Sequence, residues 1–87
     1  MSITDPLTRL VWLLQKIPAD QLHDVLQDLM TPQEISELAE RIELLHQLKQ
    51  GKTQREIASD MGISVTTVSR GNRVLKYGKW VIGEYVG

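Results

Sequence analysis

The segment from Thr31 to Gly51 carries the strongest helix start and stop signals in the sequence. Thr31 can cap a helix, Pro32 suits the first helical position, and Glu34 completes a capping box. Gly51 suits the left-handed conformation that commonly ends a helix. A long helix reaching Gln50 is therefore predicted, and it constrains the rest of the fold.

This long helix has apolar side chains on two opposite sides. At about 100° per residue, one side collects Ile35, Leu38, Ala39, Ile42 and Leu45. Leu44 and Leu48 lie nearly opposite, on the same side as Arg41. A helix that is apolar on two sides is buried on two sides, and so short a chain has few elements with which to cover it. A second copy of the chain is the expected cover; the alternative is that the N-terminal helices wrap the long helix within one monomer.

Two more helices are predicted before the long one. Apolar residues recur with the i, i+3, i+4, i+7 pattern over residues 7–14 and again over residues 22–29. At the other end, residues 79–87 are predicted to form either a last short helix or a strand-like segment. The chain is thus expected to be all-α.

Between the long helix and the tail, two short helices are predicted on either side of a tight turn. Thr53 opens the first with a second capping box, and Gly62 must stop it. Ser64 caps the next helix, which is expected to run to Lys76.

The spacing of small and apolar residues in this pair is typical of a helix-turn-helix. Ala58 is small enough for the two helices to approach closely, and Gly62 supplies the turn. Ile57 is expected to face inward, Ile63 to fill the gap beneath the turn, and Val68 to anchor the second helix. We therefore divide a single domain, residues 1–87, into dimerisation helices, a helix-turn-helix and a tail, at residues 1–51, 52–78 and 79–87.

The charge is unevenly distributed along the chain. Residues 1–51 hold four basic and eight acidic side chains, a balance of −4, whereas residues 52–87 hold six basic and three acidic, a balance of +3. The net charge of −1 conceals this asymmetry. A basic half is a cue for a polyanionic partner such as double-stranded DNA.

The residues expected to contact DNA lie on the two short helices and beside them. They are Lys52, Gln54, Arg55, Ser64, Val65, Thr66, Thr67, Ser69, Arg73 and Lys76. Short hydroxyl side chains can enter the major groove, and Arg55 can make a bidentate contact with guanine. The lysines and Arg73 would face phosphates, which dominate affinity and its salt dependence. The alternative is that these are solvated charges on a small helical core.

Residues from about Val25 to Gly78 resemble the tryptophan repressor family. The runs that carry the resemblance are Leu29-Met30-Thr31-Pro32-Gln33-Glu34, Ala39-Glu40-Arg41-Ile42, Gln54-Arg55-Glu56-Ile57 and Val68-Ser69-Arg70-Gly71-Asn72. A glycine inside a helix costs about 1 kcal/mol, so Gly71 indicates that something comes close to the backbone there. The resemblance implies an intertwined helical homodimer that represses transcription by binding a palindromic operator.

The resemblance also implies L-tryptophan as a corepressor, held between the central helix of one chain and the recognition helix of the other. By motif match, Arg41 and Arg70 sandwich the indole, Gly71 allows close approach, and Thr31 lies at the pocket edge. Guanidinium groups stack on aromatic rings and pair with carboxylates, which suits these roles.

Some positions depart from the family pattern. Val74 stands where the family has a serine that helps hold the ligand's ammonium, and Asp28 is acidic where an apolar residue is expected. The turn between Gly51 and Gln54 is one residue shorter, as in a sister branch with no established ligand. A ligand-independent regulator therefore stays open, as does a helical protein–protein interaction module.

An enzyme is not expected. The chain has no cysteine, and His23 and His46 have no third ligand in register, so neither a metal site nor a catalytic site is predicted. Each histidine is interpreted as a helix-surface residue. The longest apolar run, Leu10 to Leu14, is far shorter than the ~20 residues of a membrane span. No membrane partner and a cytoplasmic location are expected.

Overall fold

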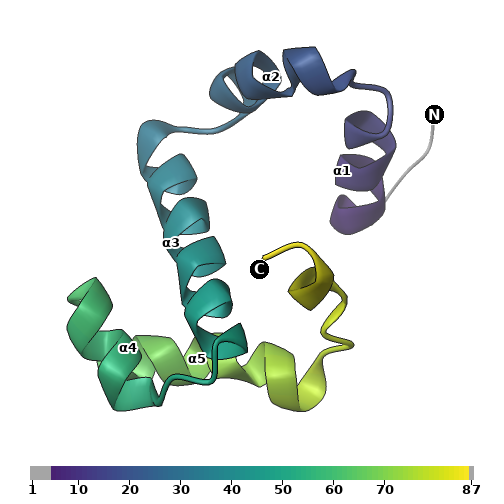
Figure 1. Ribbon diagram of the computed structural model, residues 1–87. Coiled ribbons are helices and arrows are strands. Elements are labelled where there is room, and N and C mark those ends of the chain that lie inside the picture. Colours follow the sequence, from purple (N-terminus) through teal and green to yellow (C-terminus); the bar gives the residue numbers. More distant parts are fainter. Residues whose placement is uncertain (1–4, 87) are drawn as a thin grey trace. The chain divides into compact units, whose positions relative to one another are not determined.

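The computed structural model describes residues 5–86, except for the side chains of Val74 and Leu75. These residues form five α-helices and two short 3-10 helices, and no strand occurs among them (Figure 1). In chain order the elements are α1 (Pro6–Leu14), η1 (Ala19–Gln21), α2 (Leu22–Leu29), α3 (Pro32–Lys49), α4 (Gln54–Met61), α5 (Val65–Tyr77) and η2 (Val81–Glu84). The all-helical prediction is confirmed.

The chain divides into two compact units, Met1–Ile35 and Ser36–Gly87. In the first unit, the Asp5 carboxylate caps α1 by accepting a hydrogen bond of 2.8 Å from the Thr8 backbone amide. Neither α1 nor α2 contains a buried residue. The apolar side chains of α1 are exposed in the single chain: Leu7, Leu10, Val11, Trp12 and Leu14.

The start of α3 is the capping box that the sequence predicts. Thr31 Oγ1 accepts a hydrogen bond from the Glu34 amide at 3.1 Å, and Glu34 Oε1 accepts one from the Thr31 amide at 2.9 Å. These two bonds hold the pKa of the Glu34 carboxyl below its ordinary value. The helix ends at Lys49, one residue before the predicted end, and Gly51 takes the left-handed conformation at φ +83°.

The core of the second unit forms where α4 and α5 pack against the C-terminal half of α3. Its buried members are Leu44, Leu45, Leu48, Ile57, Ala58, Val68 and Val86. Ile57 and Val68 are fully buried at 0% exposure, and Ile63 packs against this core. The predicted inward positions are thus confirmed. By contrast, Leu38 and Ile42 on α3 remain 44% and 48% exposed in the single chain.

The turn between α4 and α5 also follows the local signals. Thr53 Oγ1 accepts a hydrogen bond from the Glu56 amide at 3.2 Å, and Gly62 ends α4 at φ +66°. Ser64 Oγ caps α5 by accepting a hydrogen bond of 3.1 Å from the Thr67 amide. The helix runs to Tyr77, one residue past its predicted end.

The tail forms a short 3-10 helix, η2, rather than a strand-like segment. Two residues of α3 hold it: Lys49 Nζ donates a hydrogen bond to the Gly83 carbonyl, and His46 Nδ1 lies 2.6 Å from the Val86 carbonyl oxygen. A carbonyl only accepts, so His46 Nδ1 is the donor. His46 is therefore half-buried and ties the tail to α3, in contrast to the surface role expected for it.

The two tail aromatics have different environments. Trp80 packs against the core of the second unit, and a Cβ at Gly83 would overlap its indole ring. Tyr85 is 76% exposed in the single chain. Trp80 thus covers core within its own chain, whereas any cover provided by Tyr85 would have to come from a partner.

Candidate functional site

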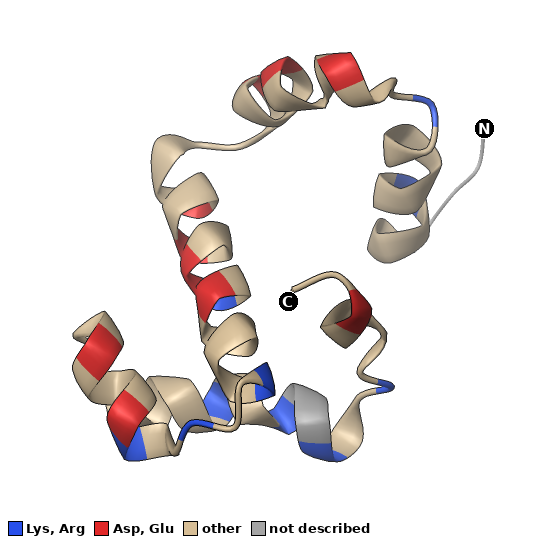
Figure 2. Cartoon of the chain, in the orientation of Figure 1, with Lys and Arg blue, Asp and Glu red and all other residues tan. Residues whose placement is uncertain are grey.

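Opposite charges gather on different helices of the second unit. Figure 2 shows acidic residues along α3 and basic residues along α5. Helix α5 contains Arg70, Arg73 and Lys76 and no acidic residue, and all three basic side chains are exposed. This helix therefore offers an exposed surface of one sign, which attracts polyanions.

One face of α5 combines short polar side chains with a guanidinium. Thr66, Ser69 and Arg73 follow one another at i, i+3 and i+7, so they lie on one side of the helix, and all are exposed. Val65 precedes them and is 46% exposed. Arg55 and Lys76 are also exposed, whereas Lys52 is half-buried.

Several side chains predicted to contact DNA instead make contacts within the chain. Ser69 Oγ donates a hydrogen bond of 2.7 Å to Gln54 Oε1, which joins α5 to α4. Lys52 Nζ forms a 3.0 Å ion pair with Asp60. The Ser64 and Thr67 hydroxyls lie 2.9 Å apart at the cap of α5. These interactions orient the two helices and occupy part of the hydrogen-bonding capacity that the prediction assigned to DNA.

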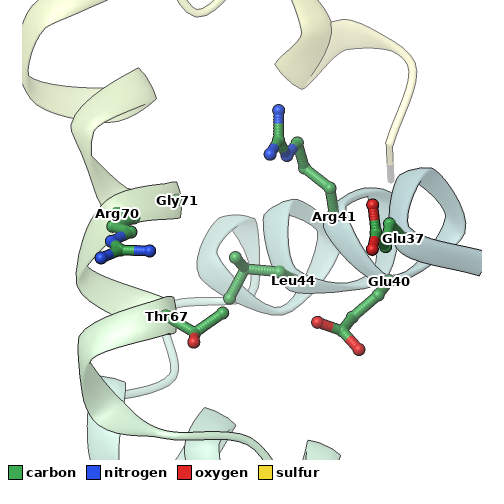
Figure 3. A pocket seen from close by; sticks show the side chains of 7 residues that line it. All are labelled: Glu37, Glu40, Arg41, Leu44, Thr67, Arg70 and Gly71. Carbon is green, nitrogen blue, oxygen red and sulfur yellow. The ribbon is translucent and has the colours of Figure 1, made fainter. Parts of the chain in front are cut away.

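A pocket lies between α3 and α5. Its volume is about 480 Å³, within the usual range for small-molecule sites. It is lined by Glu37, Glu40, Arg41 and Leu44 of α3 and by Thr67, Arg70 and Gly71 of α5 (Figure 3). In Figure 3, Leu44 lies between the two helices, with Arg41 and Glu40 pointing to opposite sides of it and Arg70 on the facing helix.

The pocket brings together three of the four residues predicted to bind a ligand. Arg41, Arg70 and Gly71 line it within a single chain. Thr31 belongs to the other compact unit, so its position relative to the pocket is not part of this site. The predicted departures do not contribute to the described lining either, because Asp28 also belongs to the first unit and the Val74 side chain lies outside the described residues.

Gly71 is required here by the packing of the chain itself. A Cβ at this position would overlap Cδ2 of Leu44, which is only 4% exposed. The sequence indicated a close approach to the backbone at Gly71, and the structure shows that the Leu44 side chain makes it. The glycine thus sets the separation of α3 and α5, and with it the width of the pocket.

Sequence reasoning assigned Glu37 and Glu40 to a solvated helix face, and it assigned Thr67 to DNA. Both glutamates are exposed, as expected, but they also line the pocket. The available signal was their spacing, because Glu37, Arg41 and Leu44 recur at i, i+4 and i+7 on one side of a helix. The described residues contain no cluster of three potential metal ligands.

The fold and the pocket define a small all-helical protein in which two short helices pack on a longer one beside a charged ligand-sized pocket. The family model for the Trp repressor protein matches residues 6–82. The chain belongs to the Trp repressor family.

Curated relatives are similar to this chain at moderate identity. A "Trp operon repressor homolog" of Photobacterium profundum is 38% identical over 79% of this chain and 69% of its own length. One of Vibrio cholerae is 36% identical over 71% of this chain and 61% of its own length. The "Uncharacterized protein YerC" of Bacillus subtilis is 37% identical over 68% of this chain and 57% of its own length. The chain thus spans roughly three fifths to two thirds of these relatives, and no solved structure matches it significantly.

Within the described residues, no helix combines the length and the apolar character needed to cross a lipid bilayer.

Proposed function

We propose that this protein is a homodimeric transcriptional repressor that binds a palindromic operator in the cytoplasm. The observation that carries the proposal is the exposed face of α5, where Thr66, Ser69 and Arg73 lie on a helix without acidic residues. The names of the relatives, "Trp operon repressor homolog", support a repressor role. The regulators of this family are not enzymes, which agrees with the lack of a catalytic constellation in the sequence.

In this proposal α4 and α5 act as a helix-turn-helix with α5 in the major groove. Thr66 and Ser69 reach base edges, and the methyl groups of Val65 contact thymine methyls. Arg55 at the turn reads guanine, while Arg73 and Lys76 neutralise phosphates. The Gln54–Ser69 hydrogen bond keeps the two helices in a fixed orientation while they engage the groove.

A homodimer would place two such units about one DNA turn apart, roughly 34 Å. The support within the chain is its exposed apolar surface. The side chains of Leu7 and Leu10 on α1 are 67% and 46% exposed, and Ile42 on α3 is 48% exposed. Large apolar side chains exposed together on small proteins mark interaction surfaces.

The pocket supports L-tryptophan as a corepressor. Arg41 and Arg70 both line it, and guanidinium planes can stack on an indole and pair with a carboxylate. A ligand that bridges α3 and α5 would fix the orientation of α5, which is the element that reads DNA. In the alternative, the protein is a ligand-independent regulator and α5 is oriented by packing alone.

Selection from a random duplex library tests DNA recognition. We expect one palindromic sequence to be enriched, with binding that weakens steeply between about 50 and 200 mM salt. The Arg55→Ala variant should lose base preference at one position of each half-site while keeping most of its affinity. Lys16→Ala is the matched control, because it removes one positive charge from the other compact unit. Absence of duplex binding at about 50 mM salt would favour the protein–protein interaction module.

Sedimentation tests the dimer. We expect a particle of twice the chain mass of 9.9 kDa at micromolar concentration. Calorimetric titration with L-tryptophan tests the corepressor, and heat that disappears in Arg70→Ala would support it. A folded monomer would remove the basis for two half-sites, and no heat with the wild-type protein would leave the ligand-independent regulator.

A further inference from the structure

The pocket between α3 and α5 contains carboxylates as well as guanidinium groups. Glu37 and Glu40 lie on its α3 wall beside Arg41, and Arg70 faces them from α5 (Figure 3). A site for a simple anion needs only the arginines, and negative charges at its edge would weaken it. The mixture of charges therefore indicates a ligand that carries both signs.

Glu40 is the carboxylate best placed for such a ligand. Glu40 and Arg41 are consecutive on α3, and they point to opposite sides of the apolar Leu44 side chain (Figure 3). Glu40, Arg41 and Arg70 make no ion pair within the part of the chain that the structure describes. Both signs of charge are thus available to a ligand resting on Leu44.

The chemical class follows from this arrangement. In an α-amino acid the carboxylate and the ammonium are attached to the same carbon, so their protein partners must lie close together on one small site. The pocket provides guanidinium groups for the carboxylate, a carboxylate for the ammonium, and Leu44 for an apolar side chain.

We propose that Glu40 binds the ammonium group of a zwitterionic α-amino acid whose carboxylate is held by the pocket arginines. This inference rests on the ligand pocket of the proposed function and adds a residue that discriminates the amino acid from its desamino analogue. Glu40 is a binding residue in this role, because its carboxylate touches the ligand.

The experiment compares two probes that differ only at the ammonium. L-tryptophan and indole-3-propionate share the indole and the carboxylate, but the second has hydrogen in place of the ammonium. Both are titrated by calorimetry into wild type, Glu40→Gln and Glu43→Gln. Glu43 is the matched control, since it lies on α3 outside the pocket and contacts Gln47 at 2.9 Å.

We expect Glu40→Gln to weaken L-tryptophan binding by about three- to tenfold, as for a charged hydrogen bond at an exposed site. Binding of indole-3-propionate should be unchanged or tighter, because a negative charge near its carboxylate has been removed. Glu43→Gln should change neither affinity.

Equal weakening of both probes by Glu40→Gln, or no effect on either, would overturn the role of Glu40 while leaving the corepressor in place. If wild type binds neither probe, this inference and the corepressor both fail. The DNA selection described above is unaffected by that outcome, so the two proposals fail separately.

Discussion

The Leu44 side chain occupies the space that a Cβ at Gly71 would fill, so a residue of α3 rests directly against the backbone of α5. This contact determines how closely the two helices approach. It also gives the pocket its floor, because both residues line it. Stability and the shape of the candidate ligand site therefore depend on the same pair.

Gly71→Ala should lower the free energy of unfolding by about 1 kcal/mol. Overpacking against a buried leucine costs about 1–3 kcal/mol, and the better helix propensity of alanine returns up to ~1 kcal/mol. Urea denaturation of Gly71→Ala, Leu44→Ala and the double variant measures this. The double variant should be more stable than the sum of the single effects predicts. A Gly71→Ala protein more stable than wild type would show that Leu44 moves aside freely.

The hydrogen bond between Ser69 and Gln54 should show measurable coupling. Removing it by Ser69→Ala is expected to cost about 0.5–1 kcal/mol, because the bond is short but exposed. A double-mutant cycle with Gln54→Ala isolates the pair from the other effects of each truncation. Additive single effects would mean that solvent replaces the bond without loss.

Gly62→Ala should destabilise the turn between α4 and α5. Gly62 has φ +66°, which costs a residue with a Cβ about 1–2 kcal/mol, and nothing within 4 Å of the added atom would offset or increase that cost. Gly62→Asn should lose less, since asparagine tolerates this conformation. Thermal unfolding measures both variants, and equal stability of Gly62→Ala and wild type would contradict the backbone explanation.

The capping box of α3 should make stability depend on pH in the acid range. The Thr31 amide, and after it the Thr31 hydroxyl, lower the pKa of the Glu34 carboxyl in the folded chain below its ordinary value of 4.5. A carboxyl with a depressed pKa in the folded state stabilises it above the unfolded value, and that contribution is lost as the pH falls through the folded pKa. Melting temperature should therefore fall more steeply below pH 4.5 in wild type than in Glu34→Gln.

Glu34→Gln is the informative variant because the amide oxygen can still accept the bond from Thr31 while the charge is gone. A carboxyl-detected NMR titration of wild type gives the pKa itself. A Glu34 that titrates at or above 4.5 would contradict the capping-box origin of the shift.

Arg73→Ala should weaken binding to the selected operator and to unrelated duplexes by similar factors. Arg73 is exposed on α5, and in the proposed complex it binds a phosphate rather than a base. The slope of log affinity against log salt should become shallower by about 1, because the variant neutralises one phosphate fewer in each complex it forms. Fluorescence anisotropy at several salt concentrations measures the slope, and weakening confined to the operator would instead assign Arg73 to base recognition.

The sequence by itself determined the helices, their caps and the turn, and these predictions agree with the structure to within one residue at the ends of α3 and α5. Such features depend on residues three or four positions apart, as in the Thr31–Glu34 box, so the pattern is visible without the fold. Only the tertiary structure decided what lies against Gly71, which hydroxyl Gln54 accepts, and that His46 holds the tail. Those partners are far apart in the sequence, and they meet only because α3, α4 and α5 cross at particular positions. The crossing is set by packing around Leu44, Ile57 and Val68, which helical periodicity does not encode.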